Sequence, residues 1–150
     1  MHLLSQCVPT KYVQLITLIS LALFLVISPT SHANKAAGKV IIAVGKVTAQ
    51  QEDKSPRKLR RRSKFFPGDT VVVAPDSRAQ LRFSDGAIMA LEADSVIRID
   101  EYKFENNGGE GDKSFYTLIK GGFRTITGII GKSNPDAYEA RTAVATIGIR

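Results

Sequence analysis

Hydrophobic and polar residues recur at a regular spacing through residues 71–102. Divided into units of eight, this segment reads VVVAPDSR, AQLRFSDG, AIMALEAD and SVIRIDEY. Side chains on a β-strand alternate between its two faces, so an even period keeps the same columns on the same face. The pattern therefore predicts four five-residue strands separated by polar corners. The predicted buried positions are the third column, Val73, Leu81, Met89 and Ile97, and the fifth column, Pro75, Phe83, Leu91 and Ile99.

More than one all-β architecture is compatible with this repeat. In a small β-solenoid or β-roll, each strand and corner would stack on the next. In an antiparallel β-meander or sandwich, Asp85-Gly86 would form the two-residue turn of a hairpin. The periodicity does not separate these arrangements, and unrelated turns also recur about every 8–12 residues in short-stranded proteins. In each arrangement Leu81 points into the core and Arg82 points outward.

Strand patterning continues outside the repeat, and no window shows the 3.6-residue period of an amphipathic helix. An opening strand is expected over 39–48, with Gly45 as a bulge or bend. The other expected strands are 114–119, 123–130, 137–142 and 143–149. The expected connections are a flexible loop at 106–112, a Gly121-Gly122 corner and a turn at 133–136. The predicted fold class is therefore all-β.

The first 33 residues have the pattern of a secretory signal peptide. Lys11 precedes an apolar run over 13–27, and the small-residue pattern Ser31-His32-Ala33 follows. This order of a basic residue, a short apolar run and a cleavage site is typical of exported proteins. The sequence thus predicts a signal peptide over 1–33, cleavage after Ala33, a β domain over 34–150, and a periplasmic or secreted product. The alternative is an uncleaved run at 13–27 that anchors the protein in the membrane.

Cysteine and histidine are confined to the segment that cleavage would remove. The chain has one cysteine, Cys7, and two histidines, His2 and His32. The exported domain would then lack thiol nucleophiles, Cys/His zinc ligands and histidine acid–base catalysis. No disulfide framework is possible with one cysteine. We therefore expect a protein that is not an enzyme, has no catalytic or metal-binding residues and needs no cofactor.

Basic residues are concentrated in one short segment of a chain whose net charge is +7. This candidate patch for an anionic partner consists of Arg57, Lys58, Arg60, Arg61, Arg62 and Lys64. Such runs bind nucleic acids, anionic lipids or polyanionic polymers, or they are simply solvated. An envelope location argues against nucleic acid. The alternative interpretation is an exposed, mobile hairpin loop between Val47 and Thr70.

Several motifs in order along the chain resemble the FecR domain, the periplasmic domain of the iron-citrate regulator type. They are GKV at 38–40, GKV at 45–47, PGDT at 67–70, SRAQLRFSDG at 77–86, SVIRI at 95–99, LIKGGFR at 118–124 and RTAVATIGIR at 141–150. The resemblance implies a β-rich, solenoid-like domain with an interaction role outside the cytoplasmic membrane. Members that regulate sigma factors carry a cytoplasmic segment before a membrane span. Only about a dozen residues precede the apolar run here, so sigma-factor regulation is not carried over.

The expected function is that of a free-standing, exported FecR-domain protein that binds another envelope component, an unidentified protein or polymer. Contact with the membrane would be transient, through the signal peptide. The alternative is a membrane-anchored signalling subunit related to sigma-factor regulators. Structural roles at corners are expected for Gly68, Asp69, Asp85, Gly86, Gly121 and Gly148, and Arg82, Arg98 and Arg124 are candidates for the polar face.

The segment 143–150 ends on Ile149 and Arg150 without a polar tail. The resemblance implies that another strand follows this motif, which suggests a truncated domain. An apolar strand edge recruits other chains. We therefore expect self-association through the C-terminal strand.

Overall fold

A computed structural model describes residues 35–105, 109–142 and 146–148. The chain divides between Ala33 and Asn34, and the unit from Asn34 to Arg150 is the one considered below. The predicted signal peptide, its cleavage site and its alternative as an anchor lie outside the described residues. Within the described ranges, no helix is long and apolar enough to cross a membrane.

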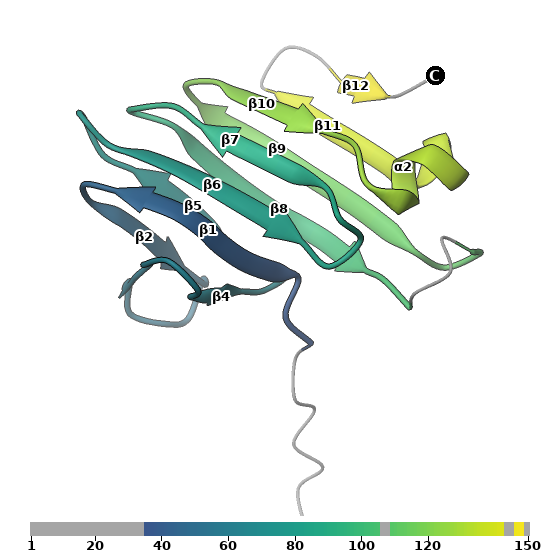
Figure 1. Ribbon diagram of the computed structural model, residues 1–150, viewed down its shortest axis with the longest axis horizontal. Coiled ribbons are helices and arrows are strands. Elements are labelled where there is room, and N and C mark those ends of the chain that lie inside the picture. The colour runs from purple at the N-terminus through teal and green to yellow at the C-terminus, as the bar shows by residue number, and fades with distance from the viewer. Residues whose placement is uncertain (1–34, 106–108, 143–145, 149–150) are drawn as a thin grey trace, which may run out of the picture. The chain divides into compact units, whose positions relative to one another are not determined.

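Two β-sheets make up this domain, and the predicted all-β class is confirmed (Figure 1). Sheet A contains, in spatial order, β10 (Phe123–Ile126), β7 (Ile88–Leu91), β6 (Arg78–Phe83), β1 (Gly38–Val44) and β4 (Lys64–Phe65). Sheet B contains β12 (Thr146–Gly148), β11 (Tyr138–Thr142), β9 (Lys113–Lys120), β8 (Val96–Lys103), β5 (Thr70–Val73), β2 (Val47–Gln50) and β3 (Arg57–Lys58). Neighbouring strands are antiparallel, except that β11 runs parallel to β9.

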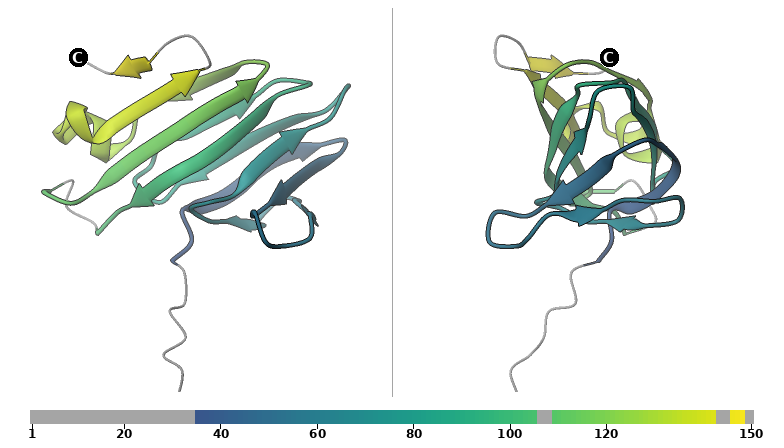
Figure 2. Two further views of the ribbon diagram at one scale, coloured as in Figure 1. Left: turned by 180° about the vertical axis from the view of Figure 1, so that it is seen from behind. Right: turned by 90° about the vertical axis from the view of Figure 1, so that its left-hand side faces the viewer.

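The sheets face one another and enclose a single hydrophobic core (Figure 2). Phe83 of sheet A lies at its centre, with its ring centroid 5.2 Å from the centroids of both Tyr102 and Tyr116 of sheet B. Phe65 meets the Phe83 ring edge-on at 5.0 Å. Tilted and edge-on aromatic pairs of this kind add to the stabilisation from area burial. The two facing sheets correspond to the sandwich among the expected alternatives, and the solenoid arrangement is not confirmed.

The eight-residue repeat arises because four successive short strands face this core, two from each sheet. β5 and β8 pair with each other in sheet B, whereas β6 and β7 form a hairpin in sheet A. The third column is confirmed as buried, since none of its side chains is more than 1% exposed. In the fifth column Pro75 is the exception: β5 ends at Val73, so Pro75 lies in the exposed corner.

Two corners differ in detail from their sequence-based predictions. The β6–β7 loop has three residues, not two, because the Phe83 N–H donates to the Ala87 carbonyl at 2.9 Å. Within it the Gly86 N–H donates to the Phe83 carbonyl at 3.1 Å, and Gly86 has a left-handed φ of 87°. This is the common three-residue hairpin with a glycine bulge. The expected strand over 39–48 is two strands, because the chain bends at Gly45 and passes from sheet A to sheet B.

The end of the domain also contains helical turns that the sequence pattern did not indicate. The strand expected over 123–130 ends at Ile126, and a short helix, α2 (Ile129–Ser133), follows. A 3₁₀ turn, η1 (Pro135–Ala137), leads into β11. The sequence pattern assigned the apolar pair Ile129-Ile130 to a strand. In α2 Ile130 is fully buried and Ile129 is exposed. The expected strand over 143–149 is described only at Thr146–Gly148, and part of the 106–112 loop also lies outside the described residues.

Candidate interaction surface

The basic segment is partly built into the sheets. Arg57 and Lys58 form β3 at one edge of sheet B, and Lys64 begins β4 at one edge of sheet A. Leu59 between them is 2% exposed and belongs to the core. The segment therefore crosses from one sheet to the other and is not a single loop between Val47 and Thr70.

Arg57 is occupied by an internal partner. Its guanidinium forms an ion pair with the buried Asp69 carboxylate and lies 5.5 Å from the centroid of the Phe66 ring. The Asp69 carboxylate also accepts the Phe66 N–H at 2.8 Å. Asp69 closes the Pro67-Gly68 turn, in which Gly68 has a φ of 83°. These contacts give Arg57 a structural partner, whereas no ion pair between described residues involves another basic residue of the segment.

A tight turn over 60–63 docks the end of the basic segment onto β1 of sheet A. Arg62 has a left-handed φ of 73°, and its N–H donates to the Val40 carbonyl at 2.8 Å. The Val40 N–H in turn donates to the Ser63 carbonyl at 2.9 Å. This docking places Lys64 directly opposite Lys39 of β1. The backbone thus brings together two lysines that are far apart in the sequence.

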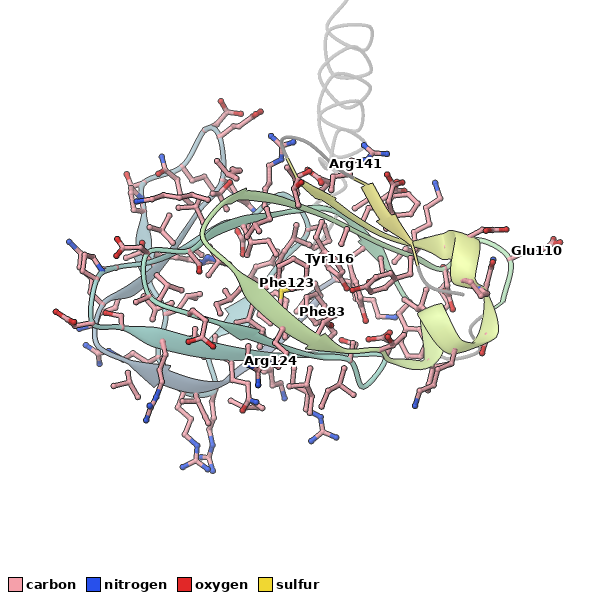
Figure 3. The ribbon with its side chains drawn as sticks, turned by 90° about the horizontal axis from the view of Figure 1, so that it is seen from above. Phe83, Glu110, Tyr116, Phe123, Arg124 and Arg141 are labelled. Carbon is pink, nitrogen blue, oxygen red and sulfur yellow. The ribbon has the colours of Figure 1, made fainter. Side chains whose placement is uncertain are left out.

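Sheet A carries basic residues across its outer face. Lys64, Lys39 and Arg82 are direct cross-strand neighbours on β4, β1 and β6. Adjacent strands lie about 4.8 Å apart, so these three positions fall within about 10 Å. We call the exposed basic residues of sheet A the cationic face: Lys39, Lys64, Arg78, Arg82 and Arg124. Figure 3 shows Arg124 on the opposite outer side of the sandwich from Arg141, with Phe83 and Tyr116 between the sheets.

The charges of the cationic face are not balanced. The five strands of sheet A contain these five basic residues and no aspartate or glutamate. Among the ion pairs formed by described residues, none involves a member of the cationic face. Like charges directly opposite each other destabilise a sheet. An unbalanced row that costs stability is the kind of local conflict found at functional sites.

The outer face of sheet B has a different electrostatic character. Arg98 pairs with Asp100, Arg141 pairs with Glu139, and Lys113 lies 3.2 Å from Glu101. The Arg141 guanidinium lowers the pKa of Glu139 by hydrogen bonding. Arg98, a sequence candidate for the polar face, is therefore on a surface where most basic residues have an acidic partner. Arg82 and Arg124, the other two candidates, belong to the cationic face.

Asp85 connects three parts of the domain. Its carboxylate accepts hydrogen bonds from the Ala87 N–H at 3.1 Å, the Tyr102 hydroxyl at 3.1 Å and the Ile130 N–H at 3.4 Å. The β6–β7 hairpin is thereby tied to β8 and to α2. Gly128 permits this approach, because a Cβ at that position would lie 2.3 Å from the Asp85 carboxylate. Desolvation raises the pKa of Tyr102, and the neighbouring Asp85 raises it further.

The other residues expected at corners lie as follows. Gly68, Gly86 and Gly121 occupy turns with left-handed φ angles. Gly148 is the last residue of β12 and not a corner. In the described part of the chain, no group of three His, Cys, Asp or Glu side chains is placed to hold a metal ion.

Sequence reasoning missed two members of the cationic face, Lys39 and Arg78. Their alternation with buried neighbours marks them as outward-facing, but only the order of the strands in sheet A places them beside the other basic residues. Of the predicted patch, only Lys64 belongs to the cationic face. Arg60, Arg61 and Arg62 lie exposed in the turn that leads to it, and Lys58 is exposed on β3.

Comparison with known proteins identifies a family. The FecR protein model matches residues 69–150, which is more than half of the chain and extends from the Asp69 turn through β12. No curated protein and no solved structure matches the chain. FecR domains are regulatory, non-enzymatic domains related to envelope signalling, and they are typically periplasmic. The resemblance seen in the sequence motifs is confirmed, and the chain belongs to the FecR family.

Proposed function

We propose that this protein is an exported, non-enzymatic interaction module that binds an anionic component of the bacterial envelope through the cationic face. Family membership supports the envelope setting and the absence of catalysis. The restriction of Cys7, His2 and His32 to the first 33 residues also argues against common catalytic chemistry. Periplasmic or secreted location follows from the proposed cleavage after Ala33.

The observation that carries the proposal is the unbalanced charge of the cationic face. Five exposed basic residues share one face of a rigid sheet, and no described acid pairs with them. A partner of opposite charge would relieve the repulsion between Lys64, Lys39 and Arg82. It would also be attracted over a distance of about 10 Å at moderate ionic strength. Binding would then supply the balance that the isolated domain lacks.

Photo-crosslinking from the cationic face tests this function. A photoreactive residue replaces Gln80, which lies on the outer face between Arg78 and Arg82. The matched control replaces Thr117 on the outer face of sheet B. We expect Gln80, but not Thr117, to capture an envelope component in living cells. Equal capture from both positions, or capture of cytoplasmic components alone, would contradict the proposal.

The alternative function, a membrane-anchored envelope signalling subunit, is distinguished by the fate of the first 33 residues. Amino-terminal sequencing of the protein from the envelope fraction should give Asn34 as the first residue. Retention of the apolar segment 13–27 in the membrane fraction would favour the anchored subunit instead. The cationic face would then act beside a membrane to which the chain is permanently attached.

A further inference from the structure

We propose that the anionic component bound by the cationic face is the headgroup surface of a lipid bilayer. This inference rests on the proposed function and narrows its partner to one chemical class. It depends on the combination of basic and aliphatic side chains on the same outer face. Neither feature alone separates a lipid surface from a soluble polyanion.

Large aliphatic side chains are exposed among the cations. Ile42 and Val44 of β1 are each 44% exposed, and Ile126 of β10 is 64% exposed. Val44 is the direct cross-strand neighbour of Arg78. Along one row of the sheet, Lys39 and Arg82 are followed by the neighbouring positions Ile88 on β7 and Ile126 on β10. Arg78 and Arg82 therefore each have a large aliphatic cross-strand neighbour on the same surface.

A β-bulge is responsible for two of these exposed side chains. The register between β1 and β6 shifts between Val40 and Ile42, so Val40 pairs with the buried Leu81 and Ile42 pairs with Gln80. Strict alternation from the buried Val40 would place Ile42 and Val44 in the core. The bulge turns both outward and directs the smaller Ala43 toward the core instead. Bulges of this kind redirect side chains and are characteristic of functional positions.

A bilayer headgroup surface fits both features at once. Lipid phosphates would pair with Lys39, Arg82 and Arg124, while aliphatic groups would enter the boundary between headgroups and acyl chains. A soluble acidic polymer would leave the aliphatic groups in water. A second copy of the same face is disfavoured, because two unbalanced cationic surfaces repel each other.

Vesicle sedimentation with the protein in the form that its host exports tests the inference. The vesicles are an equimolar mixture of phosphatidylglycerol and phosphatidylcholine, or phosphatidylcholine alone. The face variant is Lys39→Ser, Arg82→Ser and Arg124→Ser. The charge-matched control is Lys58→Ser, Lys103→Ser and Lys120→Ser on sheet B. The amino-terminal residues of this form are the same in every variant, so any contribution that they make to binding is common to all of them.

We expect binding to the mixed vesicles and little binding to phosphatidylcholine alone. Each basic residue near an anionic surface contributes about fivefold, so the face variant should bind about 100-fold more weakly. The sheet B control should change binding less than tenfold. A third variant, Val44→Ser and Ile126→Ser, keeps every charge and should still weaken vesicle binding. Its binding to heparin, a soluble polyanion, should not change.

Three results would overturn the inference. Equal losses in the face variant and the sheet B control would mean that net charge, and not this face, governs binding. Vesicle binding that is unchanged by Val44→Ser and Ile126→Ser, with equally strong binding to heparin, would identify a polyanion and leave the proposed function standing. If the face variant altered binding to neither vesicles nor heparin, the lipid inference and the proposed function would both fail.

Discussion

Replacing Asp85 by alanine should destabilise the domain far more than replacing an exposed acid. The Asp85 side chain is 2% exposed and accepts hydrogen bonds from Ala87, Tyr102 and Ile130. The Asp85 N–H also donates to the Tyr102 hydroxyl at 2.9 Å. Truncation to alanine removes the acceptor but leaves these buried donors in place. The hairpin, β8 and α2 then lose their common connection.

The magnitude follows from the number of donors left without a partner. An unsatisfied buried donor costs about 1–3 kcal/mol. The Ala87 N–H and the Tyr102 hydroxyl lose bonds of normal length, whereas the Ile130 N–H loses a longer one at 3.4 Å. We therefore expect a loss of about 3 kcal/mol in the free energy of unfolding, from a total of roughly 6–17 kcal/mol for a domain of this size.

Urea denaturation followed by circular dichroism provides the assay. Glu92→Ala is the matched control, because Glu92 is an exposed acid that follows β7, and it should change stability by less than about 0.5 kcal/mol. Asp85→Asn keeps one acceptor oxygen and should lose less than Asp85→Ala. Tyr102→Phe removes the hydroxyl partner, so the double variant Asp85→Ala, Tyr102→Phe should lose less than the sum of the two single losses.

The reasoning would be refuted by either of two measurements. One is a loss below about 1 kcal/mol for Asp85→Ala, which would mean that water or rearrangement satisfies the donors. The other is full additivity of Asp85→Ala and Tyr102→Phe, which would mean that the two side chains do not share a hydrogen bond in solution.

Leu81→Asp should unfold the domain because it places an unpaired charge at a fully buried position. Arg82→Asp should be neutral or slightly stabilising because it sets an acid beside Lys39. Chemical denaturation of both variants measures the two effects, and equal losses of stability would contradict the assigned strand register. Burial raises the pKa values of three tyrosines above their ordinary value of 10: Tyr102, Tyr116 and Tyr138. Their neutral forms are favoured in the folded state, so stability should be fully present below pH 10 and fall as the pH rises above it. Denaturation midpoints measured together with phenolate absorbance check this, and phenolate formation near that pH with no loss of stability would oppose it. In the described part of the chain β12 forms one edge of sheet B, so the protein should self-associate as its concentration rises; light scattering that shows only monomer at high concentration would argue against this.

Within residues 71–102 the hydrophobic pattern was sufficient to predict the buried face of each strand, although Pro75 lies outside the strands. Leu81 and Met89 are fully buried and Arg82 is exposed, as their columns indicated. The reason is local, because alternation along a strand places residues on one face or the other whatever the strand pairs with. The turn residues Gly68 and Gly86 were also predictable from local sequence, because a left-handed backbone conformation in a short turn favours glycine.

Which strands pair was decided only by the tertiary structure. An eight-residue period is equally compatible with stacked coils and with strands that are divided between two sheets. The choice depends on contacts between distant segments, such as β5 with β8 and β1 with β6. Burial of α2 likewise depends on the place that Asp85 and Gly128 provide for it. A helix this short has too few residues to show a period of its own.

The candidate surface required three-dimensional information for the same physical reason. The sequence concentrates positive charge at 57–64, but the fold engages Arg57 with Asp69 and brings Lys64 beside Lys39. The bulge in β1 reverses the faces of Ile42 and Val44, which alternation from Val40 would have buried. Sequence patterns determine the chemistry of each strand and its local alternation. Cross-strand register and sheet order determine which of those side chains act together as one surface.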